Sequence, residues 1–101
     1  MPNKASPLNN WIGKRLHFVG IGGAGMSGLA RIALSHGITV TGSDAKDSTV
    51  LSALQALGAE VNAAHRSEQV DGADFVIFST AISASNVELI RARELNLPIL
   101  T

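Results

Sequence analysis

The chain has 101 residues, a length that suits one domain. Of these residues 46% are hydrophobic and 16% are charged, which is typical of a folded soluble protein and not of a disordered one. Eight Lys and Arg residues balance eight Asp and Glu residues, so no long-range field attracts nucleic acid or an anionic membrane. The absence of cysteine excludes disulfides and thiolate metal sites, and no apolar run approaches the ~18 residues of a membrane helix. We therefore expect a cytoplasmic protein that binds any anion through local contacts.

The first 14 residues lack the apolar core of a secretory signal, and we expect a flexible tail with Trp11 packed on the domain surface. Short apolar or β-branched runs then predict five strands. These strands are expected at residues 16–19, 38–41, 59–61, 74–78 and 97–100.

Helices are expected between these strands. Apolar residues recur at helical spacing over residues 26–34 and again over residues 50–57, so each segment predicts a helix with one buried side. Gly37 and Gly58 are placed to end these two helices as left-handed caps.

Two helix starts are expected from polar residues. Asp47 is in position to cap the second helix. Ser85 and Glu88 have the S-x-x-E spacing of a capping box, which predicts the start of a third helix.

Strands separated by single helices predict parallel pairing with right-handed crossovers. The expected fold class is therefore α/β, a Rossmann-like doubly wound parallel sheet of about five strands with helices on both faces. Such a sheet normally continues into another helix, so we expect residues 15–101 to be one domain of a longer protein.

The most informative motif is a glycine-rich loop. Gly20, Gly22 and Gly25 form G-x-G-x-x-G between a predicted strand and a predicted helix, the context that the dinucleotide-binding fingerprint requires. Gly20 would permit the tight turn, Gly22 the close approach of a phosphate, and Gly25 close packing of the helix on the strand. Main-chain N–H groups of residues 23–26 would face a diphosphate at the helix N-terminus, where the helix dipole favours an anion. A glycine-rich turn that only permits tight packing is the alternative.

The carboxyl ends of the strands direct attention to further residues, because ligands of open parallel sheets bind there. Asp44 follows the second strand, where an acidic residue typically accepts hydrogen bonds from ribose hydroxyls. The alternative role of Asp44 is to cap the next helix. His65 and Arg66 follow the third strand and residues 79–82 follow the fourth.

The remaining histidines are interpreted as structural. His17 lies within the first strand, and His36 lies at a helix end, where a partial positive charge is favourable. The sequence contains no metal-ligand spacing, no nucleophile elbow and no Gly-Lys-Ser/Thr of an ATP-binding loop. We therefore assign neither ATP nor a catalytic residue to this chain.

The run HFVGIGGAGMSG, residues 17–28, resembles the opening of the Mur ligase family, and within it the branch that adds L-alanine to UDP-N-acetylmuramic acid in peptidoglycan synthesis. Residues 42–44, 65–66 and 81–83 follow in the order and spacing of that branch. The resemblance spans about residues 15–101. The related tripeptide-recycling branch usually differs within the glycine loop and fits less well.

The resemblance implies a three-domain enzyme. The first domain would hold the UDP part of UDP-N-acetylmuramic acid, the central domain would bind ATP and Mg²⁺ through a P-loop, and the third would help to close the site. The muramoyl carboxylate would be activated as an acyl phosphate and attacked by the amine of L-alanine. This chain has no P-loop, so we expect it to bind no cofactor, to need the remaining ligase domains in cis and to be inactive alone.

The resemblance also implies roles for particular residues. The diphosphate would be bound by Gly22, Gly23, Ala24, Gly25, Met26 and Ser27. The ribose and uridine would be bound by Asp44 and His65. The substrate would be bordered at the strand ends by Ser79, Thr80, Ala81 and Ile82.

Two other functions stay open from the residues. The glycine fingerprint and Asp44 also suit the NAD-binding domain of a dehydrogenase or of a ligand-sensing regulator. The extended motif through Ser27 and Gly28 favours the ligase. A non-catalytic interaction module without a ligand is the third possibility.

Overall fold

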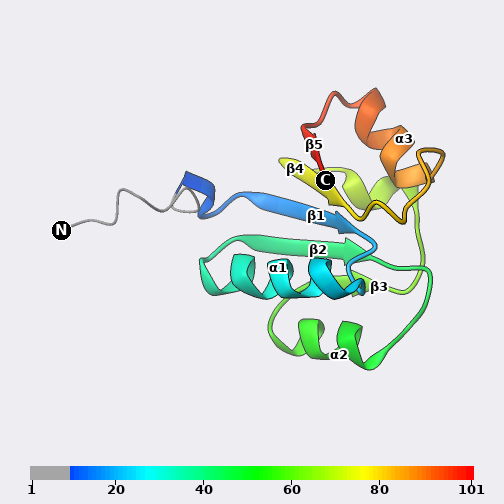
Figure 1. The fold of residues 1–101 in the computed structure, drawn as a ribbon. Helices are drawn as coiled ribbons and strands as arrows, with labels where there is room; N and C mark the ends of the chain where they lie inside the picture. The colour runs from blue at the N-terminus through cyan, green and yellow to red at the C-terminus, as the bar shows by residue number, and fades with distance from the viewer. Residues whose placement is uncertain (1–9) are drawn as a thin grey trace.

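The computed structural model describes residues 10–101 (Figure 1). Five parallel strands form one sheet in the order β3-β2-β1-β4-β5. The strands are β1 (Arg15–Val19), β2 (Thr39–Ser43), β3 (Glu60–Asn62), β4 (Phe75–Phe78) and β5 (Ile99–Leu100). The helices are α1 (Ala24–Ser35), α2 (Thr49–Ala56) and α3 (Val87–Glu94), with a 3₁₀ helix, η2 (Ser67–Val70), between β3 and β4. The predicted Rossmann-like fold class is confirmed.

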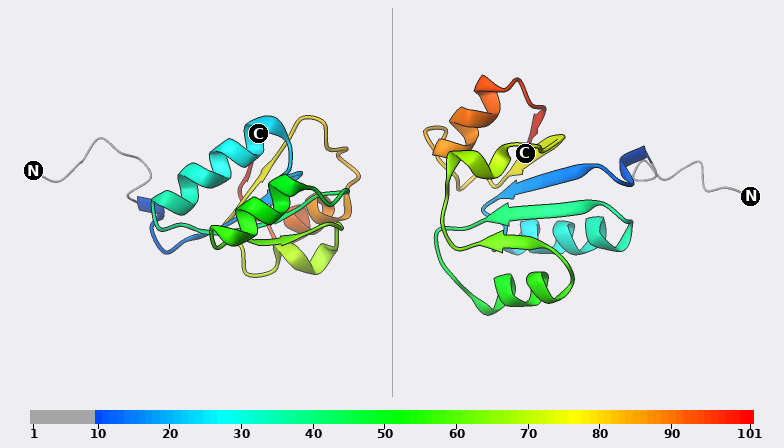
Figure 2. Two further views of the ribbon diagram at one scale, coloured as in Figure 1. Left: turned by 90° about the horizontal axis from the view of Figure 1, so that it is seen from below. Right: turned by 180° about the vertical axis from the view of Figure 1, so that it is seen from behind.

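Helical elements cover both faces of the sheet (Figure 2). On one face, α1 and α2 pack on side chains of β1 and β2, with Phe18 and Leu54 fully buried between them. On the other face, η2 and α3 pack on β1 and β4, with Val76 and Leu89 buried. Successive strand residues point to opposite faces, which is why both sides of β1 are buried.

The connection from β3 to β4, where the sequence indicated no helix, contains only the short η2 helix. This helix packs against α3. In α1 the buried side is also narrower than expected, because Ala30 and Ala33 are buried while Leu29 remains 38% exposed.

Both predicted N-terminal helix caps are wrong in their residues. The N-cap of α2 is Ser48, whose side chain accepts from the Leu51 N–H, while Asp47 instead accepts from the N–H of Ser48. The N-cap of α3 is Asn86, which accepts from the N–H of Glu88. The Glu88 side chain cannot close a capping box because it turns into the protein and is fully buried.

The expected tail of residues 1–14 lies largely outside the described residues. Trp11 stacks on Phe75, with ring centroids 4.2 Å apart and an interplanar angle of 11°. The N–H of Gly13 donates to the carbonyl of Gly37, which has a left-handed φ of +77° at the end of α1. The surface packing expected of Trp11 and the cap expected of Gly37 are both confirmed.

Candidate functional site

The glycine loop between β1 and α1 is tied to the end of β2. The N–H groups of Gly20 and Ile21 both donate to the carbonyl of Ser43, at 2.8 and 3.0 Å. Gly20 has a φ of +84°, a conformation that favours glycine, and its carbonyl accepts from the N–H of Gly23 at 3.1 Å. The tight turn predicted at Gly20 is confirmed, but the amide of Gly23 is used inside this turn.

Gly22 contacts Asp44 and not open space. The N–H of Gly22 donates to Oδ2 of Asp44 at 2.8 Å, and a Cβ at Gly22 would lie 2.8 Å from that same oxygen. The N–H of Asp44 in turn donates to the carbonyl of Asn62 at the end of β3. The missing side chain of Gly22 therefore makes room for the Asp44 carboxylate, which braces the loop.

The first turn of α1 presents main-chain N–H groups. Gly23 is its extended N-cap, with no side-chain cap and no acidic residue in the turn that follows. The N–H of Ser27 donates to the carbonyl of Gly23, whereas within residues 10–101 the N–H groups of Ala24, Gly25 and Met26 have no hydrogen-bond partner, as expected for the first amides of a helix. The dipole of α1 makes this end favourable for an anion.

Gly25 does not serve the packing role expected from the sequence. A Cβ at Gly25 would meet no atom within 4 Å, so no close approach of the helix to the strand depends on it. The residue is exposed and faces free space at the first turn of α1.

A hollow of about 200 Å³ joins the start of α1 to the end of β4. It lies between β1 and β4, where the strand order reverses and ligands of open α/β sheets bind. Its lining residues come from the loop, from β4 and from the segments after β4 and β5. They are Gly23, Ala24, Gly25, Met26, Phe78, Ser79, Thr80 and Thr101.

The other predicted site residues do not line this hollow. Ile82 packs under the loop, since a Cβ at Gly20 would lie 3.0 Å from its Cδ1. Ala81 is exposed beside it, and Asp44 and His65 stand at the ends of β2 and β3. A larger hollow of about 430 Å³ borders η2 and α3, but none of the predicted site residues lines it.

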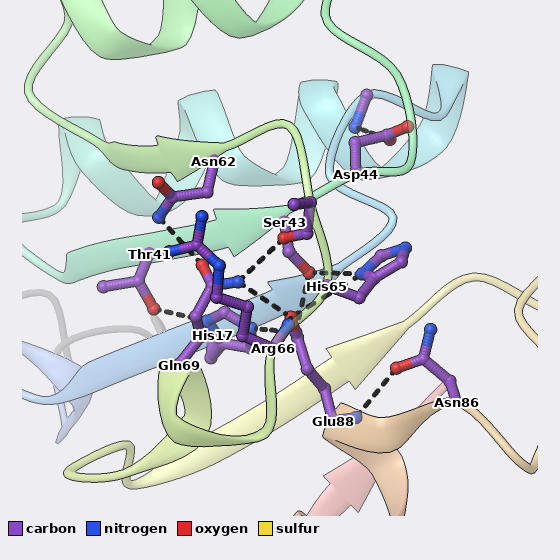
Figure 3. A network of polar contacts seen from close by, with 12 residues as sticks. His17, Thr41, Ser43, Asp44, Asn62, His65, Arg66, Gln69, Asn86 and Glu88 are labelled. Carbon is purple, nitrogen blue, oxygen red and sulfur yellow. Dashed lines mark hydrogen bonds and ion pairs between the residues drawn. The ribbon is translucent and has the colours of Figure 1, made fainter.

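A buried polar network lies beneath the site, on the face covered by α3 (Figure 3). His17 of β1 lies between two partners, with Nδ1 2.6 Å from Oγ1 of Thr41 and Nε2 2.6 Å from Oε1 of Glu88. Ser43 donates to the same Oε1 at 2.6 Å. All four residues are buried, and His17, Ser43 and Glu88 are fully so. The structural role expected of His17 is confirmed.

The network extends to the segment that follows β3. Oε2 of Glu88 accepts from the N–H of Arg66 at 2.8 Å and from Nε2 of Gln69 at 3.1 Å. Nδ1 of His65 lies 2.9 Å from Oγ of Ser43 and 3.6 Å from Oε2 of Glu88. Glu88 thus connects α3 to two strands and to the 65–69 segment, with His65 held at the end of β2.

The ionised form of Glu88 is stabilised by these contacts. Burial alone raises the pKa of this carboxyl, but hydrogen bonds from His17, Ser43 and the Arg66 N–H, together with the His17 charge, outweigh burial and lower the pKa below its usual value. Every buried polar side-chain atom in the described part of the chain has a partner.

Sequence reasoning missed Glu88 as a member of the site. One signal was available, because His17 is a polar residue within the apolar run of residues 16–19, and Thr41 and Ser43 are polar residues on the neighbouring strand. Residues at alternate strand positions share a face, so His17 and its neighbours on β2 predict a buried polar partner on the helix above them. The S-x-x-E spacing suggested a local role for Glu88 instead.

Residues 10–101 contain no cluster of three or more His, Cys, Asp or Glu side chains that could hold a metal ion. Over the same range, no helix is both long and apolar enough to cross a membrane.

Comparison with known proteins gives consistent matches. The family model described as "Mur ligase family, catalytic domain" matches residues 15–101. A UDP-N-acetylmuramate–L-alanine ligase from Renibacterium salmoninarum is 58% identical over 86 residues, which make up 85% of this chain and 18% of that protein. The chain therefore spans about a fifth of the length of such curated relatives.

Two solved structures share the fold closely. A UDP-N-acetylmuramate–alanine ligase from Thermotoga maritima matches with a TM-score of 0.82 and 36% identity, over 85% of this chain and 20% of that chain. A UDP-N-acetylmuramate:L-alanyl-γ-D-glutamyl-meso-diaminopimelate ligase from Neisseria meningitides matches with a TM-score of 0.77 and 34% identity, over 85% and 28%.

Proposed function

Because the chain belongs to the Mur ligase family, we propose that it holds the UDP part of UDP-N-acetylmuramic acid for an ATP-dependent ligase that adds L-alanine to that sugar. Relatives that bear the name of this ligase cover most of the chain. They support the alanine-adding branch, which the extended glycine motif also favours.

The hollow between α1 and the end of β4 carries this proposal. The N–H groups of Ala24, Gly25 and Met26 are the donors at its edge. A diphosphate placed there accepts hydrogen bonds from main-chain donors and gains from the dipole of α1. No lysine is needed, which suits a chain with a formal net charge of zero. The hydroxyls of Ser79 and Thr80 supply further polar groups on the opposite wall.

Asp44 is proposed to bind the ribose. Its Oδ2 accepts from the N–H of Gly22 and its Oδ1 from the N–H of Lys46 at 3.3 Å. Each carboxylate oxygen has two lone pairs, so the residue keeps capacity to accept from vicinal hydroxyls. The bond to Gly22 places the proposed ribose site and diphosphate site on adjoining parts of one loop.

The chain is proposed to bind and orient substrate, not to make the amide bond. Its sequence has no Gly-Lys-Ser/Thr run of a P-loop, so we assign ATP and Mg²⁺ to another part of the ligase. Those groups are proposed to belong to further domains of a cytoplasmic ligase. There the muramoyl carboxylate would be activated as an acyl phosphate and attacked by the amine of L-alanine.

Calorimetry with the 101-residue chain tests the proposal. UDP-N-acetylmuramic acid is expected to bind and NAD is expected not to bind. Gly25→Val places a side chain at the hollow and should weaken binding by about tenfold or more, because it displaces the phosphate from its donors. Gly28→Val is the matched control, since Gly28 is also surrounded by open space but does not line the hollow. Binding of NAD without a response to the UDP-sugar would refute the ligase assignment, and unchanged binding by Gly25→Val would refute this placement.

A further inference from the structure

The proton positions in the buried network follow from the chemistry of Glu88. An ionised carboxylate only accepts hydrogen bonds. Oγ of Ser43 lies 2.6 Å from Oε1 of Glu88 and donates to it, so the single hydroxyl proton of Ser43 is committed to that bond. Nε2 of His17 lies at the same distance from Oε1 and must carry a proton to donate.

This arrangement fixes the proton on His65. With its proton directed to Glu88, Ser43 can only accept from its other neighbour, Nδ1 of His65, at 2.9 Å. The second group near Nδ1 is Oε2 of Glu88, at 3.6 Å, which also only accepts. Nδ1 therefore carries the proton, and in a neutral imidazole the remaining nitrogen, Nε2, is an acceptor.

The accepting nitrogen is available to a ligand. The side chain of His65 is 17% exposed, and within residues 10–101 no hydrogen-bond partner contacts Nε2. Figure 3 shows the Nδ1 edge of the ring directed at Ser43 and Glu88 and the opposite edge directed away from the network. His65 forms a hydrogen bond with Ser43, the last residue of β2, and Asp44 follows Ser43 directly in the chain. The base of a nucleoside whose ribose is held by Asp44 would therefore extend beside His65.

We propose that Ser43 and Glu88 are positioning residues that hold His65 in its Nδ1–H tautomer. Its Nε2 then accepts from N3–H of uracil, an atom that carries no hydrogen in cytosine, and so selects uracil over cytosine. This inference rests on the proposed UDP-binding function. Uracil presents N3–H between two carbonyls, whereas cytosine presents an unprotonated N3 that accepts. A hydrogen-bond acceptor such as Nε2 of His65 pairs with N3–H of uracil and is repelled by the lone pair on N3 of cytosine.

The tautomer is tested without any ligand. Long-range ¹H–¹⁵N NMR of the histidine rings in the wild-type chain should show a protonated Nδ1 and an unprotonated Nε2 for His65. In Ser43→Ala the acceptor at Nδ1 is lost, and the Nε2–H form, preferred by free histidine, should become populated. Ser83→Ala is the control, because Ser83 is exposed and contacts Ser85 and not the network.

Base selection is tested by binding of UDP, N3-methyl-UDP and CDP to the wild-type chain. N3-methyl-UDP and CDP are expected to bind about tenfold more weakly than UDP, because neither base offers Nε2 a donor at N3. His65→Ala should remove the preference, Ser43→Ala should reduce it, and Ser83→Ala should keep it. A variant that only loses stability would bind UDP, N3-methyl-UDP and CDP more weakly by the same factor, so its preference for UDP would be unchanged.

The outcomes separate this inference from the function on which it rests. Equal binding of UDP and N3-methyl-UDP, or an Nε2–H tautomer in the wild-type chain, overturns the inference and leaves UDP binding intact. Failure to bind any UDP compound overturns the proposed function and base selection together, and the ring spectrum then still decides whether the network sets the tautomer.

Discussion

Replacement of Gly22 by alanine should separate the bracing role of Asp44 from a general effect of the glycine loop. The added Cβ would lie 2.8 Å from Oδ2 of Asp44, which is too close, so the carboxylate must move and its 2.8 Å bond from the Gly22 N–H is lost or weakened. A hydrogen bond to a charged group contributes about 1.5–3 kcal/mol. Alanine also restricts the unfolded chain, which offsets about 0.4–1 kcal/mol of that loss.

The net expectation is a free energy of unfolding about 1–2 kcal/mol lower for Gly22→Ala, with the melting temperature reduced by about 4–8 °C per kcal/mol in a domain of this size. Gly25→Ala is the matched control three residues along the loop. Its Cβ would meet no atom within 4 Å, and alanine favours the helix, so its stability should be unchanged or up to about 1 kcal/mol higher.

Urea denaturation of both variants, repeated in an Asp44→Ala background, measures the coupling directly. In the absence of the Asp44 carboxylate, Gly22→Ala should lower the free energy of unfolding only slightly. The coupling energy between the two substitutions is then expected to be about 1 kcal/mol or more. Asp44 does not brace the loop if Gly22→Ala and Gly25→Ala change the free energy of unfolding equally. The same conclusion follows if the changes caused by Gly22→Ala and Asp44→Ala simply add in the double variant.

Three further variants test the packing and the network. Glu88→Gln should lower the free energy of unfolding at pH 7 by roughly 3 kcal/mol. Because the folded-state pKa of Glu88 is below its usual 4.5, the ionised carboxylate stabilises the fold above pH 4.5, and this stabilisation is lost as the pH falls through the folded-state pKa. The difference in unfolding free energy between Glu88→Gln and wild type should therefore shrink in urea titrations at acid pH. Gly42→Ala would place a Cβ 2.4 Å from Cδ1 of buried Ile21 and should destabilise by about 1–3 kcal/mol in thermal melts, and no loss would show that Ile21 repacks freely. Trp11→Ala removes the stack on Phe75 and should cost about 1–2 kcal/mol in circular dichroism melts, whereas an unchanged melting temperature would mean that the stack contributes no stability.

The elements of the fold could be predicted because their signals are local. Five short apolar or β-branched runs, the glycine turn at Gly20 and the glycine caps at Gly37 and Gly58 each follow from the residue's own conformational preferences. Parallel pairing followed from the alternation of strands with helices. The strand ends then indicated which loops meet, and residues 23–26 and 79–80 do line one hollow.

What the sequence did not predict depends on contacts between distant segments. Glu88 meets His17 from 71 positions away, and the local S-x-x-E pattern pointed to a different role. Gly22 is required by the Asp44 side chain, a contact that spacing alone does not show. The caps are Ser48 instead of Asp47 and Asn86 instead of Ser85. Each predicted cap stands beside a residue that caps equally well, so local preference does not choose between them.

The proposed function requires that main-chain N–H groups at the start of α1 bind the diphosphate of a UDP-sugar. Titration of the ¹⁵N-labelled chain with UDP-N-acetylmuramic acid, followed by amide NMR, tests it most directly. The largest shifts, which should saturate, are expected at the amides of Ala24, Gly25 and Met26, with smaller shifts at Ser79 and Thr80. Saturable binding that leaves these three amides unmoved, with the shifts confined to another face of the domain, would contradict it.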